Sequence, residues 1–250
     1  MRGRLSRKLV THKSMQDLNS IVFDLDGTLL RTESIVLDAV AVAVNRTSGK
    51  FRLDLRPPGS EEILSLLGIP VSEFVAGLGL NLPEQASRYL AEQIDEEEIA
   101  LIEAGHARLF DGVPEILRQL KAEDWNLALI SNCSRRYLMA VSDFFDFPDY
   151  FEFSLCVEDV RLDGKGALLR ELLAKTERLA AETIYLGDRK SDWEAAQFMK
   201  CGFLGCLWGY GADEFGPRVA TIESIRNLPE VLQKIRQLPS REAKKITSRD

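Results

Sequence analysis

The sequence Ile21-Val22-Phe23-Asp24-Leu25-Asp26-Gly27-Thr28-Leu29 joins a short apolar run to two aspartates and a glycine. Such a run predicts a buried β-strand that ends in a turn. Similar strand-sized apolar runs occur at 125–130, 151–157, 183–186 and 203–208. Helical periodicity fills the gaps between them, at 113–122, 134–145, 166–179, 192–200 and 228–235. Alternation of this kind predicts an α/β fold, a doubly wound, Rossmann-like parallel sheet with helices on both faces.

One stretch interrupts this alternation. After Thr32, helical patterns follow one another without a convincing strand, at 35–45, 61–67, 71–78 and 83–105. We therefore expect an all-helical cap domain, residues 33–110, inserted into an α/β core that is formed by residues 15–32 and 111–240. Within the cap, the acidic run Asp95–Glu98 is expected to be a solvated face of a helix.

The composition narrows the possible partners. The chain has 250 residues, and its formal net charge is −7. Nucleic acids and anionic membranes favour proteins with surplus Lys and Arg, so neither is an expected partner. No apolar run approaches the roughly 18–20 residues of a membrane helix. Four scattered cysteines without zinc-ligand spacing predict reduced thiols in a cytoplasmic protein. The basic residues 1–14 and the polar tail 241–250 are expected to be disordered.

Polar residues follow three of the predicted strands at the point where each strand ends. They are Asp24 and Asp26 after the first strand, Ser131 and Asn132 after the second, and Asp188, followed by Asp192, after the fourth. Ligands of open α/β sheets bind beyond the carboxyl ends of the strands. Clustered carboxylates repel one another unless a cation neutralises them, and carboxylate oxygens suit Mg²⁺. The sequence therefore predicts a Mg²⁺ site at this edge of the sheet.

These segments resemble the four motifs of the haloacid dehalogenase superfamily. The similar segments are Phe23–Leu29, Leu129–Asn132, Lys165-Gly166 at the start of a helix, and Gly187-Asp188 with Asp192 and Ala195-Ala196. Segments 110–114 and 208–211 also resemble the phosphoglycolate-phosphatase-like branch of this superfamily. The resemblance extends over residues 20–238.

The resemblance implies the chemistry of a phosphatase. Asp24 would be the nucleophile that attacks phosphorus and forms an aspartyl-phosphate, which water then hydrolyses. Asp26 would protonate the leaving alkoxide and then activate the water. The substrate would be a small phosphorylated metabolite, either phosphoglycolate-like or a sugar phosphate.

The same resemblance implies which residues hold the metal and the phosphate. Mg²⁺ would be held by Asp24, by the backbone carbonyl of Asp26, by Asp188 and by Asp192, the last through water unless it instead orients Lys165. Stabilising charge on the phosphate oxygens is the main task in phosphoryl transfer. The residues expected to do this are Thr28, Ser131, Asn132 through its backbone N–H, and Lys165.

The superfamily offers other functions, some of which the sequence disfavours and some of which stay open. Dehalogenases lack the second aspartate, so Asp26 argues against cleavage of a carbon–halogen bond. Phosphonate cleavage would need a Schiff-base lysine in the cap, where Lys50 is the one lysine and lies in an expected loop. A sugar phosphomutase keeps Asp26 and remains an alternative, as does an inactive binding or regulatory protein. Arg31, Thr32 and Glu33 lie where the core meets the cap, as substrate contacts or as hinge residues.

Overall fold

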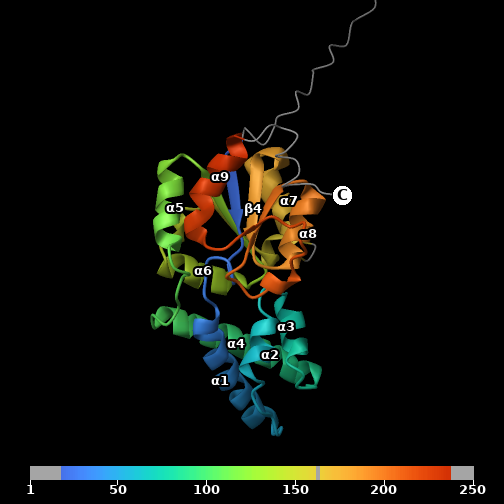
Figure 1. The fold of residues 1–250 in the computed structure, drawn as a ribbon. Helices are drawn as coiled ribbons and strands as arrows, with labels where there is room; N and C mark the ends of the chain where they lie inside the picture. Colours follow the sequence, from blue (N-terminus) through green and yellow to red (C-terminus); the bar gives the residue numbers. More distant parts are fainter. Residues whose placement is uncertain (1–17, 162–163, 238–250) are drawn as a thin grey trace, which may run out of the picture.

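A six-stranded parallel sheet forms the centre of the computed structural model, which describes residues 18–161 and 164–237 (Figure 1). Its strands are β1 (Ser20–Phe23), β2 (Asn126–Ser131), β3 (Phe153–Cys156), β4 (Thr183–Gly187), β5 (Gly202–Cys206) and β6 (Thr221–Ile222). The strand order is β3-β2-β1-β4-β5-β6, and every neighbouring pair is parallel. The doubly wound sheet expected from the sequence is therefore confirmed. The expected disordered segments 1–14 and 241–250 lie outside the described residues.

The strand register brings the polar strand ends together. Phe23, the last residue of β1, lies level with Leu129 of β2 and with Leu186 of β4. Asp24 therefore leaves the sheet between its two neighbours, β2 and β4. The strand order reverses at β1, and open α/β sheets bind ligands in the crevice that such a reversal creates.

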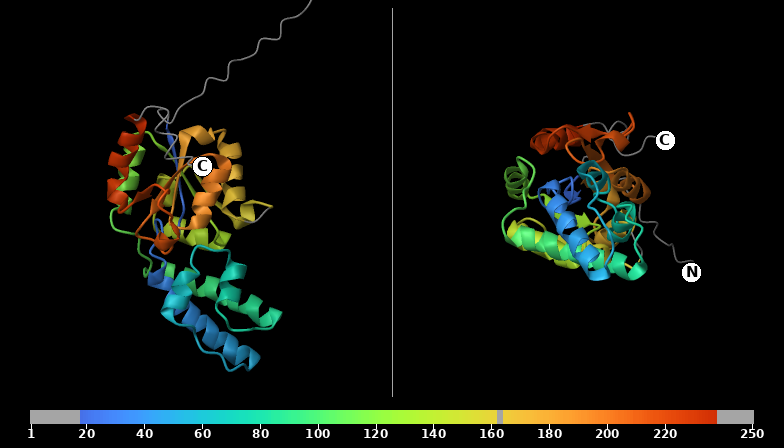
Figure 2. Two further views of the ribbon diagram at one scale, coloured as in Figure 1. Left: turned by 45° about the vertical axis from the view of Figure 1, so that its right-hand side comes forward. Right: turned by 90° about the horizontal axis from the view of Figure 1, so that it is seen from below.

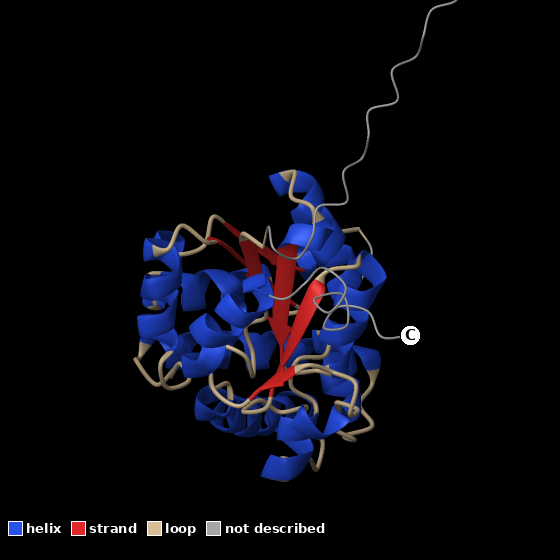
Figure 3. Ribbon diagram, turned by 45° about the horizontal axis from the view of Figure 1, so that its top comes forward, coloured by secondary structure: helices blue, strands red, loops and turns tan. Residues whose placement is uncertain are grey.

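Helices cover both faces of the sheet (Figure 3). They are α5 (Val113–Ala122), α6 (Arg135–Phe144), α7 (Lys165–Thr176), α8 (Lys190–Met199) and α9 (Leu228–Gln237). Successive side chains of a strand point to opposite faces. Accordingly, Ile21 and Phe23 pack in the cluster formed with α5, α6 and α9, whereas Val22 packs in the cluster formed with α7 and α8.

A second group of helices lies below the carboxyl ends of the strands in the side views of Figures 1 and 2. These helices are α1 (Glu33–Phe51), α2 (Ser60–Ser65), α3 (Val71–Gly77) and α4 (Glu84–Glu103). They share a buried apolar cluster that contains Val40, Phe74 and Leu90, and α1 packs along α4. We refer to α1–α4 as the cap helices. No described residue between Glu33 and Glu103 belongs to a strand, as the sequence led us to expect.

The structure differs from the expectations in a few elements. β6 was not expected, because its two residues are too short to give a periodic pattern. Helix α1 continues to Phe51 instead of ending near Asn45, and its C-cap residue Arg52 adopts the left-handed conformation. None of the described helices combines the length and apolar character that crossing a membrane requires.

Candidate active site

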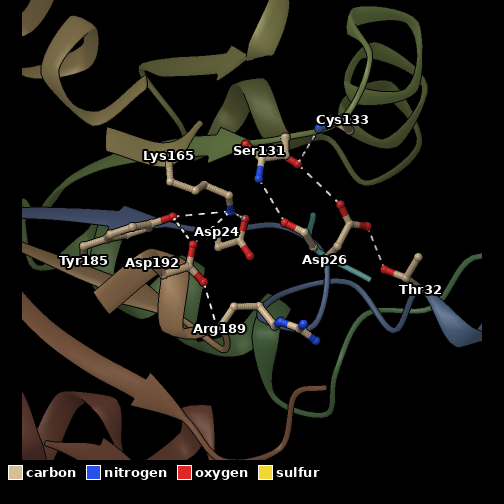
Figure 4. Close-up of polar contacts among 11 residues, drawn as sticks. Asp24, Asp26, Thr32, Ser131, Cys133, Lys165, Tyr185, Arg189 and Asp192 are labelled. Atoms are coloured by element: carbon tan, nitrogen blue, oxygen red, sulfur yellow. Dashed lines mark hydrogen bonds and ion pairs between the residues drawn. The ribbon is translucent and has the colours of Figure 1, made fainter. Parts of the chain in front are cut away.

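Asp24 lies at the centre of the site, directly after β1, and its side chain is almost fully buried. Lys165, the first residue of α7, forms an ion pair with the Oδ1 atom of Asp24 and lies 3.0 Å from Asp192 Oδ1 (Figure 4). Burial lowers the pKa of Lys165, but the charges of Asp192 and Asp24 outweigh this effect and raise it above the ordinary value. The ammonium group of Lys165 is therefore held between two carboxylates in its charged form.

Asp192 is itself fixed from two sides. The Tyr185 hydroxyl, on β4, donates a hydrogen bond to Asp192 Oδ1 over 2.7 Å. The backbone N–H of Arg189 donates to Asp192 Oδ2 over 3.0 Å. Burial raises the pKa of Tyr185 well above its ordinary value, and the charge of Asp192 raises it further, so the phenol stays protonated as a donor. Both oxygens of Asp192 are thus engaged, which favours a role in orienting Lys165.

Three buried carboxylates meet at this point. One oxygen each of Asp24, Asp188 and Asp192 lie within 4.8 Å of one another. Asp24 Oδ2 and Asp188 Oδ1 are buried and have no hydrogen-bond partner among the described residues. Burial raises the pKa of Asp188 to about 7, with a further contribution from the charge of Asp192. Three carboxylates against one ammonium leave an excess of negative charge, so the donor set fits a hard divalent cation such as Mg²⁺.

The loops around Asp188 leave it no spare room. Gly27 has a φ of +83°, a conformation that favours glycine, and a Cβ atom there would overlap the Asp188 carboxylate. A Cβ atom at Gly209 would overlap Asp188 as well. The backbone N–H of Tyr210 donates to Asp188 Oδ2 over 2.7 Å. Glycines on two loops therefore let the carboxylate reach its position beside Asp24.

Asp26 points toward a different set of groups. Its Oδ1 atom accepts hydrogen bonds from the Thr32 hydroxyl over 2.7 Å and from the Tyr137 hydroxyl over 2.9 Å. Its Oδ2 atom makes one longer contact, 3.4 Å, with the Ser131 hydroxyl. The side chain of Asp26 does not belong to the three-carboxylate cluster, so the expected metal contact through its backbone carbonyl stays a prediction.

The residues expected to bind phosphate are only partly brought together. Ser131, Asn132 and Lys165 line one cavity with Asp24 and Asp26, whereas Thr28 does not line it. The side chain of Thr28 is fully buried and lies against the Cys206 thiol. A phosphate contact by Thr28 therefore stays a prediction that this arrangement does not favour.

Of the three residues at the junction of core and cap, one lines the cavity and two do not. Thr32 lines the cavity and binds Asp26, whereas Arg31 and Glu33 pair with each other over 3.1 Å. The backbone N–H of Glu33 also donates to the Tyr210 hydroxyl. Thr32 is thus the residue of the three that reaches the site.

The cap helices close the cavity, whose volume is about 80 Å³. The loop between α2 and α3 contributes Leu67, Gly68 and Ile69, and helix α4 contributes Asp95 and Glu98. Our expectation of a solvated acidic face is therefore wrong for these two residues. Residues three apart share one side of a helix, and packing of α4 against the core turns that side toward Asp26.

Four residues of the candidate site are not predicted from the sequence. They are Tyr137, Tyr185, Asp95 and Glu98. The two tyrosines lie within predicted elements, where an aromatic residue is ordinarily read as core. The two acids, with Ala91 and Ile94 one turn earlier, mark the face of α4 that lines the cavity, and this helical spacing was the available signal.

The sequence and the fold are similar to those of several known proteins. A family model described as haloacid dehalogenase-like hydrolase matches residues 21–206. The phosphoglycolate phosphatase of Pectobacterium atrosepticum is 24% identical over 202 residues, which cover 79% of this chain and 83% of that protein. The 5'-nucleotidase of Pseudomonas aeruginosa is 26% identical over 201 residues, which cover 78% of this chain and 85% of that protein.

Solved structures with the same fold include two with related descriptions. A predicted phosphoglycolate phosphatase from Haemophilus somnus has a TM-score of 0.74 and 19% identity, covering 86% of this chain and 98% of that chain. CbbY from Rhodobacter sphaeroides in complex with phosphate has a TM-score of 0.71 and 20% identity, covering 84% of this chain and 96% of that chain. At such identities the likeness shows the fold.

The parallel sheet with helices on both faces, the strand-end carboxylates and the family match together define a hydrolase built on a doubly wound α/β core. The chain belongs to the haloacid dehalogenase-like hydrolase family, which confirms the resemblance that its motifs indicated.

Proposed function

We propose that this hydrolase releases inorganic phosphate from a small phosphate monoester through an aspartyl-phosphate on Asp24. The contacts of the two Asp24 carboxylate oxygens carry this proposal. Lys165 holds one of its oxygens, and the other is buried in the cavity without a hydrogen-bond partner among the described residues. Relatives named phosphoglycolate phosphatase and 5'-nucleotidase support a small phosphate monoester as the substrate class.

In the first half-reaction, an Asp24 oxygen attacks phosphorus and the alcohol leaves. In the second half-reaction, water attacks the phosphorus of the aspartyl-phosphate, which returns Asp24 as a carboxylate and releases phosphate. The alkoxide must receive a proton and the water must lose one. Asp26 lines the same cavity and supplies both proton transfers.

The hydrogen bonds of Asp26 assign different tasks to its two oxygens. Oδ1 accepts from Thr32 and Tyr137 and is thereby fixed in place. Oδ2 has only the long contact with Ser131. We therefore assign the proton to Oδ2, which gives it to the alkoxide and takes it back from the water.

Charge on the phosphate oxygens is met by Lys165, the Ser131 hydroxyl and the backbone N–H of Asn132. Asp24 and Asp188 would hold Mg²⁺, and the ion would supply positive charge that reduces repulsion between the attacking carboxylate and the phosphate. Asp192 keeps Lys165 in place through the 3.0 Å ion pair.

The cysteines support a cellular location for the protein. Cys133, Cys156, Cys201 and Cys206 are all unpaired. Unpaired, mostly buried thiols are typical of proteins in a reducing compartment. We infer a cytoplasmic enzyme.

Phosphate release from a panel of phosphate monoesters, with Mg²⁺ and with EDTA, tests the proposal. We expect Mg²⁺-dependent release, and we expect Asp24→Asn to lower it at least about a thousandfold. Asp143→Asn, an exposed aspartate of α6, is the matched control and should retain activity. Wild-type activity in Asp24→Asn would overturn the assignment. Interconversion of sugar phosphate isomers without phosphate release would instead indicate a phosphomutase.

A further inference from the structure

The cap side of the catalytic cavity carries negative charge. Asp95 and Glu98 of α4 line the same cavity as Asp24 and Lys165. Among the described residues that line it, Lys165 is the sole cation, and it is already held by Asp24 and Asp192. The part of a substrate that lies beyond the phosphate therefore meets carboxylates without a free positive charge.

The two carboxylates differ in their surroundings. Asp95 accepts a hydrogen bond from the Ser134 hydroxyl and lies 3.6 Å from Arg136, whose side chain is 65% exposed and does not line the cavity. Within the described part of the chain, the Glu98 carboxylate has neither an ion pair nor a hydrogen bond. Burial raises the pKa of Glu98 well above its ordinary value, and the charges of Asp26 and Asp95 raise it further. Glu98 is therefore an acidic group in need of a cationic or donor partner.

A neutral acceptor in the same cavity also lacks a partner. Asn132 is 6% exposed, and its Nδ2 atom donates to the backbone carbonyl of Gly68 over 2.9 Å. That bond fixes the orientation of the amide and leaves Oδ1 as the free acceptor. Oδ1 is buried and has no hydrogen-bond partner among the described residues. A dianionic phosphate has no proton to donate to this acceptor, whereas an N–H or O–H group of the leaving group has one.

The acidic lining continues outward. A neighbouring groove of about 370 Å³ shares Val71, Ala91, Asp95 and Ser134 with the catalytic cavity. Its other lining residues include Glu73, Glu92 and Glu158, and no Lys or Arg lines it in the described ranges. Arg135 approaches Glu158 to 4.0 Å from outside the lining. The acidic lining of the cavity thus continues along the groove, away from the phosphate site.

We propose that the leaving group of the substrate carries an ammonium, which Glu98 and Asp95 bind on the cap side while Lys165 and Asp24 engage the phosphate. The substrate class is an amino-alcohol or amino-sugar phosphate. This inference rests on the proposed phosphatase function. An ammonium supplies the positive charge that pairs with these two side chains, whereas a carboxylate on the leaving group, as in phosphoglycolate, is repelled.

Two matched series of compounds isolate the charge of the leaving group. The small series is O-phosphoethanolamine, 2-hydroxyethyl phosphate and phosphoglycolate, which carry an ammonium, a hydroxyl and a carboxylate. The larger series is the pair glucosamine 6-phosphate and glucose 6-phosphate, which differ only in an ammonium or a hydroxyl at carbon 2. Para-nitrophenyl phosphate, which carries none of these groups, reports on phosphoryl transfer itself.

Substitutions in α4 test which side chain binds the ammonium of the leaving group. Glu98→Gln should lower kcat/KM for the ammonium compounds about tenfold to a hundredfold, the range for a hydrogen bond to a charged group. It should change kcat/KM for the hydroxyl compounds and for para-nitrophenyl phosphate by less than about threefold, and Glu98→Asp should retain part of the preference. Glu103→Gln removes the same charge from an exposed position of the same helix and is the control.

The possible results distinguish a failure of this inference from a failure of the proposed phosphatase function. Preference for ammonium in at least one series, lost in Glu98→Gln, supports the inference. Two results would overturn the inference: an equal or higher kcat/KM for the hydroxyl or carboxylate compounds, or an equal loss of kcat/KM for all compounds in Glu98→Gln. In either case, Asp24-dependent hydrolysis of para-nitrophenyl phosphate would still support the phosphatase function. Failure to hydrolyse any compound, para-nitrophenyl phosphate included, would overturn the proposed function itself, and the inference with it.

Discussion

The Tyr137 hydroxyl donates a hydrogen bond to Asp26 Oδ1 over 2.9 Å, joining helix α6 to the loop that follows β1. Tyr137 is 3% exposed, and burial raises the pKa of its phenol well above the ordinary value, with the charge of Asp26 as the next contribution. The tyrosine is therefore a fixed, protonated donor beside the proposed acid and base.

This contact predicts a specific defect in Tyr137→Phe. Loss of one hydrogen bond to a carboxylate is worth about 1.5–3 kcal/mol, so we expect kcat to fall about tenfold or more. KM should change little, because Tyr137 positions Asp26 and does not hold the phosphate. Steady-state kinetics on the best substrate measures both values. Tyr150→Phe, a partly buried tyrosine packed against the core, is the control, and equal kcat for Tyr137→Phe and the wild type would remove Tyr137 from this role.

Removal of the buried ammonium should affect both stability and turnover. Lys165→Met leaves Asp24 and Asp192 without their shared cation, and breaking a buried ion pair in this way costs about 3–5 kcal/mol. We expect a lower free energy of unfolding at pH 8, a smaller loss at pH 5, where carboxylates are more readily protonated, and almost no activity. Chemical denaturation measures the loss. Lys175→Met breaks an exposed pair with Glu171 on the same helix and should cost less than about 1 kcal/mol. Equal costs for the two variants would contradict the account.

The carboxylate cluster predicts how stability depends on pH when metal is removed. The pKa of Asp188 is raised from 3.8 to about 7 in the folded chain. The folded state then binds its proton more tightly than the unfolded chain, so the stabilising contribution is lost as pH rises through this interval. In EDTA, we expect Tm to fall between about pH 5 and pH 8 and the fall to be shallower in Asp188→Asn. Mg²⁺ should raise Tm most at the upper end, because it favours the ionised carboxylates. A Tm in EDTA that rises over this interval would contradict this prediction.

The contact between cap and core can be tested at Gly68. Its carbonyl accepts from Asn132 Nδ2, its φ is +84°, and a Cβ atom there would lie 3.1 Å from the Cγ atom of Arg189. Gly68→Ala should therefore displace the loop from the core and lower kcat/KM several-fold. Gly79→Ala is a matched control, because Gly79 has a φ of +69° and no neighbour that a Cβ atom would meet. Both variants should lose about 1 kcal/mol of stability. Equal kcat/KM for the two variants would show that this contact does not matter for catalysis.

The sequence predicted the part of the site that depends on local pattern. A buried strand followed by Asp24 and Asp26, and another followed by Gly187-Asp188, place carboxylates at one sheet edge once the strands are parallel. The sequence does not predict strand β6, because a strand of two residues has no periodic pattern of apolar residues.

The cap side of the cavity depends on packing between distant segments. The spacing of Asp95 and Glu98 shows that they share one side of α4, but which side meets the core depends on how α4 packs against α6. Likewise, an amphipathic pattern predicts that Tyr137 is buried, but the position of its hydroxyl beside Asp26 depends on contacts between residues 111 positions apart.

The central claim is that Asp24 carries the phosphoryl group during turnover. Acid-quenching the enzyme with Mg²⁺ and its best substrate, followed by borohydride reduction, converts an aspartyl-phosphate to homoserine, which peptide mass spectrometry locates. We predict homoserine at position 24 when substrate is present, and none when substrate is omitted or when Asp24→Asn is used. Absence of homoserine at position 24 during confirmed turnover, or its presence at another aspartate, would contradict the claim.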